Sequence, residues 1–344
     1  MQYRDQWLQP DFYNRVQHNK LRRALWHDYR MPCIYLITMT KRESAEVPLF
    51  SSLVSKENGE IDVKFSWSGW AVYNALNRFA KEYGFIKLGR YVIMPDHVHA
   101  IIQVLEETEK PLGHYVNKLK AIATMCFRSK SQVKTPSGES VFGPGFNDRI
   151  LIHEGQLSNW NNYVIDNPRR LWLRIKHPAY FCRSYLFAKE SPSYIWDINA
   201  GKTTSDILPH QFPTFGNAQL LRYPQRTTVR FSRKFSEQEW CKKREEVLMV
   251  AKNGGVLVTP AVHAEEKRLL KEGLLLGARV IKVIAYGYPP KEKPQGEDFH
   301  HCAEGRMLLF ALNKYDPGIR RDVVNRILCE KMNACAQWIA ETVF

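Results

Sequence analysis

Apolar positions in the first half of the chain alternate between strand-like and helical spacing. They predict a strand, a helix, a two-stranded hairpin and two further helices over residues 33–40, 69–83, 85–104, 111–129 and 157–167. Val72, Leu76 and Phe79 share one face of the first of these helices, and Gly84 follows where its C-cap is expected. This order predicts an α+β fold in which helices pack on one face of an antiparallel sheet.

The periodic pattern fades in the middle of the chain, where proline, serine, threonine and glycine accumulate. We therefore expect a first domain over residues 1–190, a connecting segment over 191–230 and a second domain over 231–344.

The second domain has its own alternation of elements. Strand-like runs at 256–260 and 278–287 flank a helix-like segment at 264–277, which predicts a βαβ unit with parallel strands. A last helix is expected over about residues 317–340.

Composition and charge narrow the class of partner. The chain has 344 residues, 44% of them hydrophobic and 25% charged, which is typical of a folded protein. Its formal net charge of +15 favours a polyanionic partner, because cations that neutralise phosphates release condensed counterions. Nucleic acid is the leading partner class, and a basic protein without such a partner is the alternative.

Other bulk features bear on the compartment. Seven scattered cysteines without a CxxC pair indicate reduced thiols and a cytoplasmic protein. The polar N-terminus lacks the apolar run of a signal peptide, and no long uncharged apolar stretch predicts a membrane span.

The first candidate chemistry is a histidine pair. His97 and His99 flank Val98 in a predicted strand, so both imidazoles project to the same side. Two nitrogen ligands leave a divalent ion under-coordinated, so a third protein ligand is needed elsewhere. Solvated or hydrogen-bonded histidines are the alternative interpretation.

The second candidate is a tyrosine in the segment NNYVIDNPRR. Tyr163 and Asn167 are four residues apart and share one face of a short helix that Pro168 is expected to end. A phenol is a weak nucleophile at its usual pKa of about 10, but it can attack a phosphate beside a metal ion. A tyrosine used only for packing is the alternative.

Three segments in order, MPDHVHAII, VFGPGFNDRIL and YVIDNPRR, resemble the signatures of the REP-associated tyrosine transposases, which are HUH-type single-tyrosine enzymes. The resemblance covers roughly residues 30–180. It implies a ferredoxin-like α+β domain that nicks single-stranded or hairpin DNA and transfers the strand through a covalent 5'-phosphotyrosine.

Carried onto this chain, the resemblance implies His97 and His99 as metal ligands, Asn167 as the third ligand and Tyr163 as the nucleophile. Mg²⁺ or Mn²⁺ is the implied ion, and a homodimer is the family expectation. Two departures from the family pattern are Asp96, where Asn is usual, and Leu171 with Trp172, where small residues are usual.

Basic residues interleaved with aromatic ones predict the DNA contacts, since cations hold phosphates while rings stack on bases. Asp148 and Arg149, in the second signature, could position the site or contact DNA, or Asp148 could stabilise a turn. The candidate DNA-binding residues are Lys118, Lys120, Arg128, Lys130, Arg149, Arg169 and Arg170.

The second domain resembles the Rossmann-like DprA and SLOG group, which implies an α/β fold only. Residues 259–263, where a helix would begin after a strand, are a conceivable ligand or DNA site. The expected glycine-rich phosphate loop is not evident, because Gly254 and Gly255 precede the strand.

The sequence thus predicts a metal-dependent DNA-nicking and strand-transfer enzyme. Two other classes remain open: a non-catalytic DNA-binding or regulatory protein with a transposase fold, and a phosphodiesterase that activates water.

Overall fold

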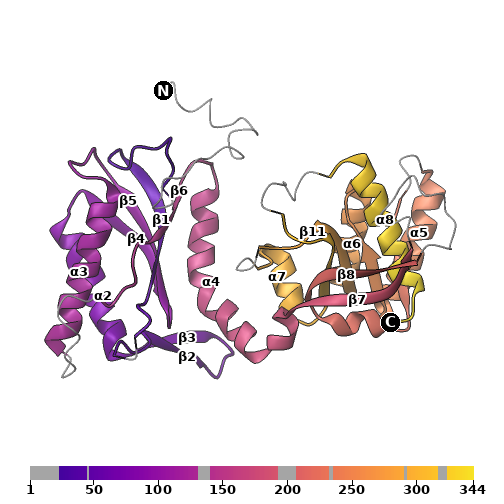
Figure 1. Cartoon of the computed structure of the whole chain (residues 1–344), viewed down its shortest axis with the longest axis horizontal. Coiled ribbons are helices and arrows are strands. Elements are labelled where there is room, and N and C mark those ends of the chain that lie inside the picture. Colours follow the sequence, from indigo (N-terminus) through magenta and orange to yellow (C-terminus); the bar gives the residue numbers. More distant parts are fainter. Residues whose placement is uncertain are drawn as a thin grey trace. The chain divides into compact units, whose positions relative to one another are not determined.

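The chain folds as two units, Met1–Trp172 and Leu173–Phe344 (Figure 1). The computed structural model describes residues 23–44, 46–130, 140–192, 207–231, 235–289, 293–316 and 324–344.

The first unit is built on a four-stranded antiparallel sheet in the order β4-β5-β1-β6. Its elements are β1 (Cys33–Thr40), β2 (Ser51–Ser55), β3 (Ile61–Phe65), α2 (Trp67–Glu82), β4 (Ile86–Ile93), β5 (His97–Val104), α3 (Leu112–Lys130), β6 (Asn147–Ile150) and α4 (Gln156–Lys176). With β5 between β1 and β4, the sheet has the split βαβ arrangement of ferredoxin-like motifs. The predicted α+β layout is confirmed, and the β2–β3 hairpin is an addition that the sequence pattern did not predict.

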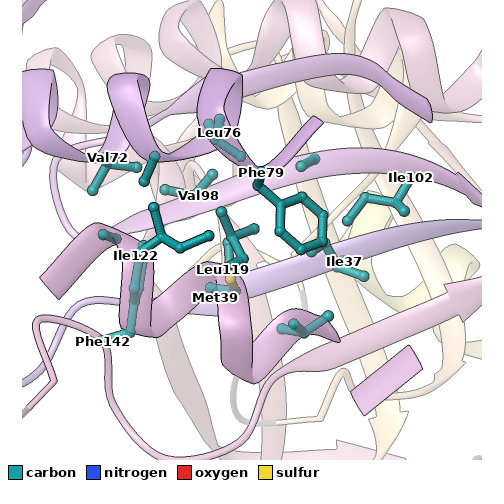
Figure 2. Close-up of a cluster of buried hydrophobic side chains, with 14 of the residues drawn as sticks. Ile37, Met39, Val72, Leu76, Phe79, Val98, Ile102, Leu119, Ile122 and Phe142 are labelled. Carbon is teal, nitrogen blue, oxygen red and sulfur yellow. The ribbon is translucent and has the colours of Figure 1, made fainter. Parts of the chain in front are cut away.

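Strand alternation gives this sheet two apolar faces. Ile37 and Met39 of β1 pack with Leu76 and Phe79 of α2 and with Leu119 of α3 (Figure 2). Between them lies β1 residue Thr38, which points to the opposite face, as period-two geometry requires.

That opposite face is covered by α4, so the prediction that the helices share one face is right for α2 and α3 and wrong for α4 (Figure 1). Trp160 and Val164 of α4 pack against Leu36 of β1 and Ile101 of β5. The two strand residues alternate with the ones that face α2 and α3, and this provides a second apolar surface for α4.

The end of α4 also differs from its prediction. The helix was expected to stop at Pro168, but it runs through this residue to Lys176. Pro168 is buried with Trp160, Val164 and Asn167. Packing along this face outweighs the one backbone hydrogen bond that a proline removes.

The second unit contains a six-stranded mixed sheet in the order β7-β8-β12-β11-β10-β9. Its elements are η2 (Pro178–Phe181), β7 (Arg183–Pro192), β8 (Ile207–Gly216), η4 (Ala218–Arg222), β9 (Arg226–Thr228), α5 (Glu237–Lys252), β10 (Val256–Thr259), α6 (Ala264–Leu275), β11 (Arg279–Tyr286), α7 (Gly296–Ala303), β12 (Met307–Asn313) and α8 (Arg326–Glu341). Leu257 and Leu309 pack with α5, α6 and α7, while Val258 and Phe310 pack with α8. Burial on both faces explains the nearly continuous apolar runs of β10 and β12.

The βαβ prediction for the second unit is confirmed, because β10 and β11 are parallel and joined by α6. The Rossmann-like interpretation is not confirmed. The strands from β9 to β12 follow one another in chain order, and among the described strands their order does not reverse as in a Rossmann sheet. Instead, the antiparallel strand β8 pairs with the edge of β12.

The boundary between the units also differs from the expectation. The segment over 191–230, predicted as a connection, contributes β8 and β9 to the six-stranded sheet, and β7 precedes it. The segment is rich in proline, yet it contains β8. This strand forms antiparallel ladders with β7 on one side and with β12 on the other. The expected start of the last helix, at 317, lies outside the described residues, and α8 begins at Arg326.

Two smaller findings complete the fold. No helix among the described residues is long and apolar enough to cross a membrane. All seven cysteines lie in the described ranges, and none is joined to another by a disulfide.

The start of α2 allows a stability test. A Cβ on Gly69 would stand 1.9 Å from the Phe50 carbonyl oxygen, which also accepts from the backbone N–H of Ser66. We expect Gly69→Ala to lower the free energy of unfolding of the first unit by about 3 kcal/mol, measured by urea denaturation. Gly84→Ala is the matched control, since nothing lies within 4 Å of its added Cβ. Equal stability of the two variants would contradict this packing.

Candidate active site

The two predicted histidines lie side by side on the face of the sheet that α4 covers. His97 and His99 alternate along β5 with Val98 and Ala100, which are buried on the other face. Ile101, next in the same series, packs against α4. The alternation that the sequence indicated therefore directs both imidazoles toward α4.

The inner nitrogens of the two rings converge. His97 Nε2 and His99 Nε2 are 3.1 Å apart, and the ring planes are inclined at 76°. His99 is only 7% exposed, while the His97 side chain is 21% exposed. One ring is thus fixed in the protein interior and the other borders solvent.

The outer nitrogens are held by neighbouring side chains. His97 Nδ1 donates to Asp96 Oδ1 at 2.6 Å, and His99 Nδ1 lies 2.8 Å from Thr38 Oγ1. Strand pairing explains the second contact, because Thr38 and His99 are register partners between β1 and β5. When both Nδ1 atoms donate outward, both Nε2 lone pairs face one point, as in metal-binding histidines whose second nitrogen is hydrogen-bonded.

Sequence reasoning missed the contribution of Thr38, which only the register of two strands distant in sequence reveals. Asp96 was noted as a departure from the family pattern. In the structure its carboxylate orients the His97 ring. The position of Asp96 next to the candidate ligand His97 was therefore the signal in the sequence, but the sequence did not show that its carboxylate would contact His97 Nδ1.

Tyr163 reaches the histidine pair from α4. Its hydroxyl lies 3.2 Å from His99 Nε2, and its ring meets the His99 ring edge-on, with centroids 5.2 Å apart. Tyr163 is 38% exposed, whereas its neighbour Val164 is buried against the sheet. The phenol is therefore accessible from solvent at the point on which both Nε2 atoms converge.

The electrostatic setting keeps His99 neutral. The pKa of His99 is lowered to about 3, mainly by burial and also by the nearby charges of His97 and Arg149. Asp96 acts weakly in the opposite sense. A neutral imidazole is the form that binds metal ions.

The donor set fits a divalent ion. Two nitrogens bound at right angles to one ion at about 2.1 Å stand about 3.0 Å apart, and the two Nε2 atoms are 3.1 Å apart. Among the described residues, no three His, Cys, Asp or Glu side chains form a metal-binding group. A third protein ligand would therefore have to be of another type, such as an amide.

Asn167, the predicted third ligand, is buried on the same face of α4 as Trp160 and Val164. Its Nδ2 donates to the backbone oxygen of Tyr163 at 3.3 Å. This contact leaves the amide oxygen as the atom that would bind an ion. Its role as a ligand stays a prediction.

The predicted DNA-binding residues do not lie together. Arg149 is exposed on β6, and its register partner on β1 is Leu36, which faces α4. Lys118 and Arg128 are exposed on α3, on the far side of the sheet from the histidines, and Arg169 is exposed on α4 with an ion pair to Asp166. Arg170 is half-buried on α4, and the side chain of Lys130 lies outside the described residues.

Lys120 is a correction to the predicted DNA contacts. It is 6% exposed, and its Nζ donates to the backbone oxygens of Gly143, at 2.7 Å, and of Gly145. Its pKa is lowered to about 8, mainly by burial and also by the charges of Arg23 and Arg42. Lys120 fixes the loop before β6 because its ammonium satisfies carbonyls that have no strand partner.

Asp148 has a structural position. Its carboxylate, 3% exposed, pairs with Arg23 and accepts from the Tyr29 hydroxyl at 2.8 Å. Adjacent strand residues face opposite ways, so Asp148 points away from the face that Arg149 occupies.

The conceivable ligand site over 259–263 is occupied by the protein itself. The Glu266 carboxylate, 3% exposed, accepts from the backbone N–H groups of Val262, His263 and Phe231. The backbone amides of Val262 and His263, directly before α6, are thus already bound by a side chain of the protein.

Comparison with solved structures gives distant matches, among them two transposases. No family model and no curated protein match the chain. A REP-associated tyrosine transposase bound to a REP hairpin is 13% identical, with 53% of this chain and 88% of that chain covered and a TM-score of 0.29. A candidate transposase from Deinococcus radiodurans R1 is 16% identical, with coverages of 41% and 95% and a TM-score of 0.26. With TM-scores this low, neither likeness bears on the chemistry.

The lowered pKa of His99 predicts a pH effect on stability. Below about pH 6.5 the unfolded chain takes up a proton at this residue, while the folded protein stays unprotonated there down to about pH 3. Stability is therefore lost as the pH falls through this window. Between pH 7 and pH 5, in the presence of a chelator, the free energy of unfolding should fall by about 1–2 kcal/mol more in the wild type than in His99→Gln. Parallel urea curves that show the same loss in both proteins would refute the neutral, buried state.

Proposed function

We propose that this chain nicks single-stranded DNA and transfers the strand, with Tyr163 as the nucleophile and a divalent ion held by His97 and His99. The observation that supports the proposal is the convergence of three atoms: the Tyr163 hydroxyl lies 3.2 Å from His99 Nε2, which lies 3.1 Å from His97 Nε2. A histidine pair used only for packing would not need both inner nitrogens turned toward an accessible phenol.

Each residue of the candidate active site has a separate role in this proposal. Asp96 and Thr38 orient the two imidazoles, and α4 presents the phenol at the solvent border. Asn167 supplies the third ligand, one turn of α4 beyond Tyr163. A bound Mg²⁺ or Mn²⁺ would neutralise charge on the scissile phosphate.

Nicking forms a bond between the Tyr163 oxygen and the 5'-phosphate and breaks the bond from phosphorus to the 3'-oxygen. The phenol loses one proton, and the departing 3'-oxygen gains one, so charge balances overall. Because the phosphotyrosine bond keeps the free energy of the broken diester, a 3'-hydroxyl can reverse the step and rejoin a strand.

DNA binding in this proposal relies on three arginines, of which Arg149 and Arg169 are exposed and Arg170 is half-buried. Arg149 shares the histidine face of the sheet, and its charge already acts on His99. Arg169 and Arg170 follow the tyrosine along α4. Together they would hold phosphates on either side of the scissile bond, whereas Lys120 is excluded from this role by its burial.

Trapping a covalent adduct tests the nucleophile. Purified protein with Mn²⁺ and labelled single-stranded hairpin DNA should give a denaturation-resistant protein–DNA adduct. Tyr163→Phe should abolish the adduct and His97→Ala should reduce it at least about 100-fold. Tyr73→Phe on α2 is the matched control and should behave as the wild type.

The products distinguish the rival functions. Cleavage that leaves no adduct and persists in Tyr163→Phe would indicate attack by water. Hairpin binding without cleavage, in the presence of metal, would indicate a regulatory DNA-binding protein. Either result would overturn the proposal.

The orienting role of Thr38 gives a second test. Thr38→Val removes the partner of His99 Nδ1 with little change in side-chain volume. We expect Mn²⁺ affinity, measured by electron paramagnetic resonance titration, to fall about 10- to 100-fold. Thr40→Val, on the same strand and exposed, is the control. Unchanged Mn²⁺ binding in Thr38→Val would show that Thr38 does not orient His99 for metal binding.

A further inference from the structure

The second unit contains a cavity of about 460 Å³ that the proposed function does not use. Its volume falls within the range of small-molecule sites, about 300–1,000 Å³. It opens where β11 and β12 end, since Gly287 follows β11 and Lys314 follows β12. Ligands of α/β sheets characteristically bind at the carboxyl ends of parallel strands.

The topology explains why the sheet opens here. β12 is parallel to β11 on one side and antiparallel to β8 on the other. The residues that directly follow β11 and β12, namely Gly287, Tyr288, Lys314 and Tyr315, therefore border the antiparallel pair of β7 and β8. The hairpin contributes Arg183–Tyr185 and Pro213–Phe215 to the wall of the cavity.

Four aromatic rings contribute to the lining. Tyr185, Phe215, Tyr288 and Tyr315 border the cavity, and Ile284, Leu309 and Ala311 form its apolar part. Tyr185 is 61% exposed and Tyr315 is 38% exposed. Such exposed rings beside an apolar floor provide faces on which a planar ring can stack.

The charged residues of the lining are all cations. Arg183 and Lys314 line the cavity, and no Asp or Glu does so among the described residues. The Arg183 guanidinium donates to the Tyr288 backbone oxygen at 3.0 Å and lies over the Phe215 ring. Lys314 Nζ lies 5.9 Å from the centroid of the Tyr185 ring. Each cation is thus set beside an aromatic face.

We propose that this cavity binds a nucleotide, with the base stacked on Tyr185 and Tyr315 and the phosphate near Lys314 and Arg183. An aromatic ring joined to an anion is the ligand that matches the stacking faces and cations of the lining, in which the described residues include no carboxylate. The ligand can be a free nucleotide or one unit of a single strand, and both share this chemistry. The inference does not depend on the nicking activity of the first unit.

The test measures binding to the full-length protein by calorimetry, with a chelator present so that DNA is not cut. The probes are dAMP, inorganic phosphate and a single-stranded hexanucleotide. Tyr185→Ala and Lys314→Gln alter the cavity at exposed or rim positions, so neither should impair folding. Lys271→Gln is the charge-matched control, because Lys271 is exposed on α6 outside the cavity.

Loss of one stacked base should weaken binding about 5- to 150-fold. Binding of dAMP that weakens in both cavity variants but not in Lys271→Gln supports a free-nucleotide site. Hexanucleotide binding with the same pattern, without dAMP binding, supports a site for single strands.

Three results would overturn the proposal. One is that neither dAMP nor the hexanucleotide binds. Another is that both bind equally well to the wild type and to Tyr185→Ala. The third is that inorganic phosphate binds as tightly as dAMP, which would indicate an anion site without base recognition.

Discussion

Trp160 and Val164 of α4 pack on Leu36 and Ile101 of the sheet, and this apolar contact positions the candidate chemistry. The histidines occupy the strand positions next to Ile101 on the same face, and Tyr163 precedes Val164 on the helix. Once the apolar pairs are in contact, the phenol lies over His99 without a dedicated loop. A site built between a strand and a helix is held more rigidly than one built on loops.

The same contact sets the electrostatics. Covering the sheet with α4 leaves His99 buried and His97 at the border, which lowers the pKa of His99 and keeps its ring neutral. Hydrogen bonds that the Nδ1 atoms of His97 and His99 make with Asp96 and Thr38 then hold the rings so that both inner nitrogens face one point. Burial, ring orientation and nucleophile position are therefore consequences of one packing interaction.

The second unit is organised by the burial of both faces of its sheet. Parallel strands buried on both faces need helices on each side, and α5, α6, α7 and α8 supply them. The antiparallel hairpin of β7 and β8 protects the edge of β12. The aromatic-lined cavity lies where the parallel and antiparallel parts of the sheet meet, beside the ends of β11 and β12.

Several features could be predicted from the sequence because they depend on local periodicity. Alternation along 97–104 placed both histidines on one face, and the spacing of Tyr163 and Asn167 placed them on one side of a helix. The βαβ unit around α6 was predicted for the same reason. These predictions need only the residue periodicity of a strand or a helix.

Tertiary structure decided everything that depends on which elements meet. The continuation of α4 through Pro168, the strands within 191–230 and the burial of Lys120 all contradict local signals, because packing and pairing outweigh single-residue propensities. The contact of Thr38 with His99 arises from strand register, and that of Tyr163 with His99 from helix packing. The sequence by itself determined which side chains share a face, and the tertiary structure determined which faces come together, since this depends on long-range burial of apolar surface.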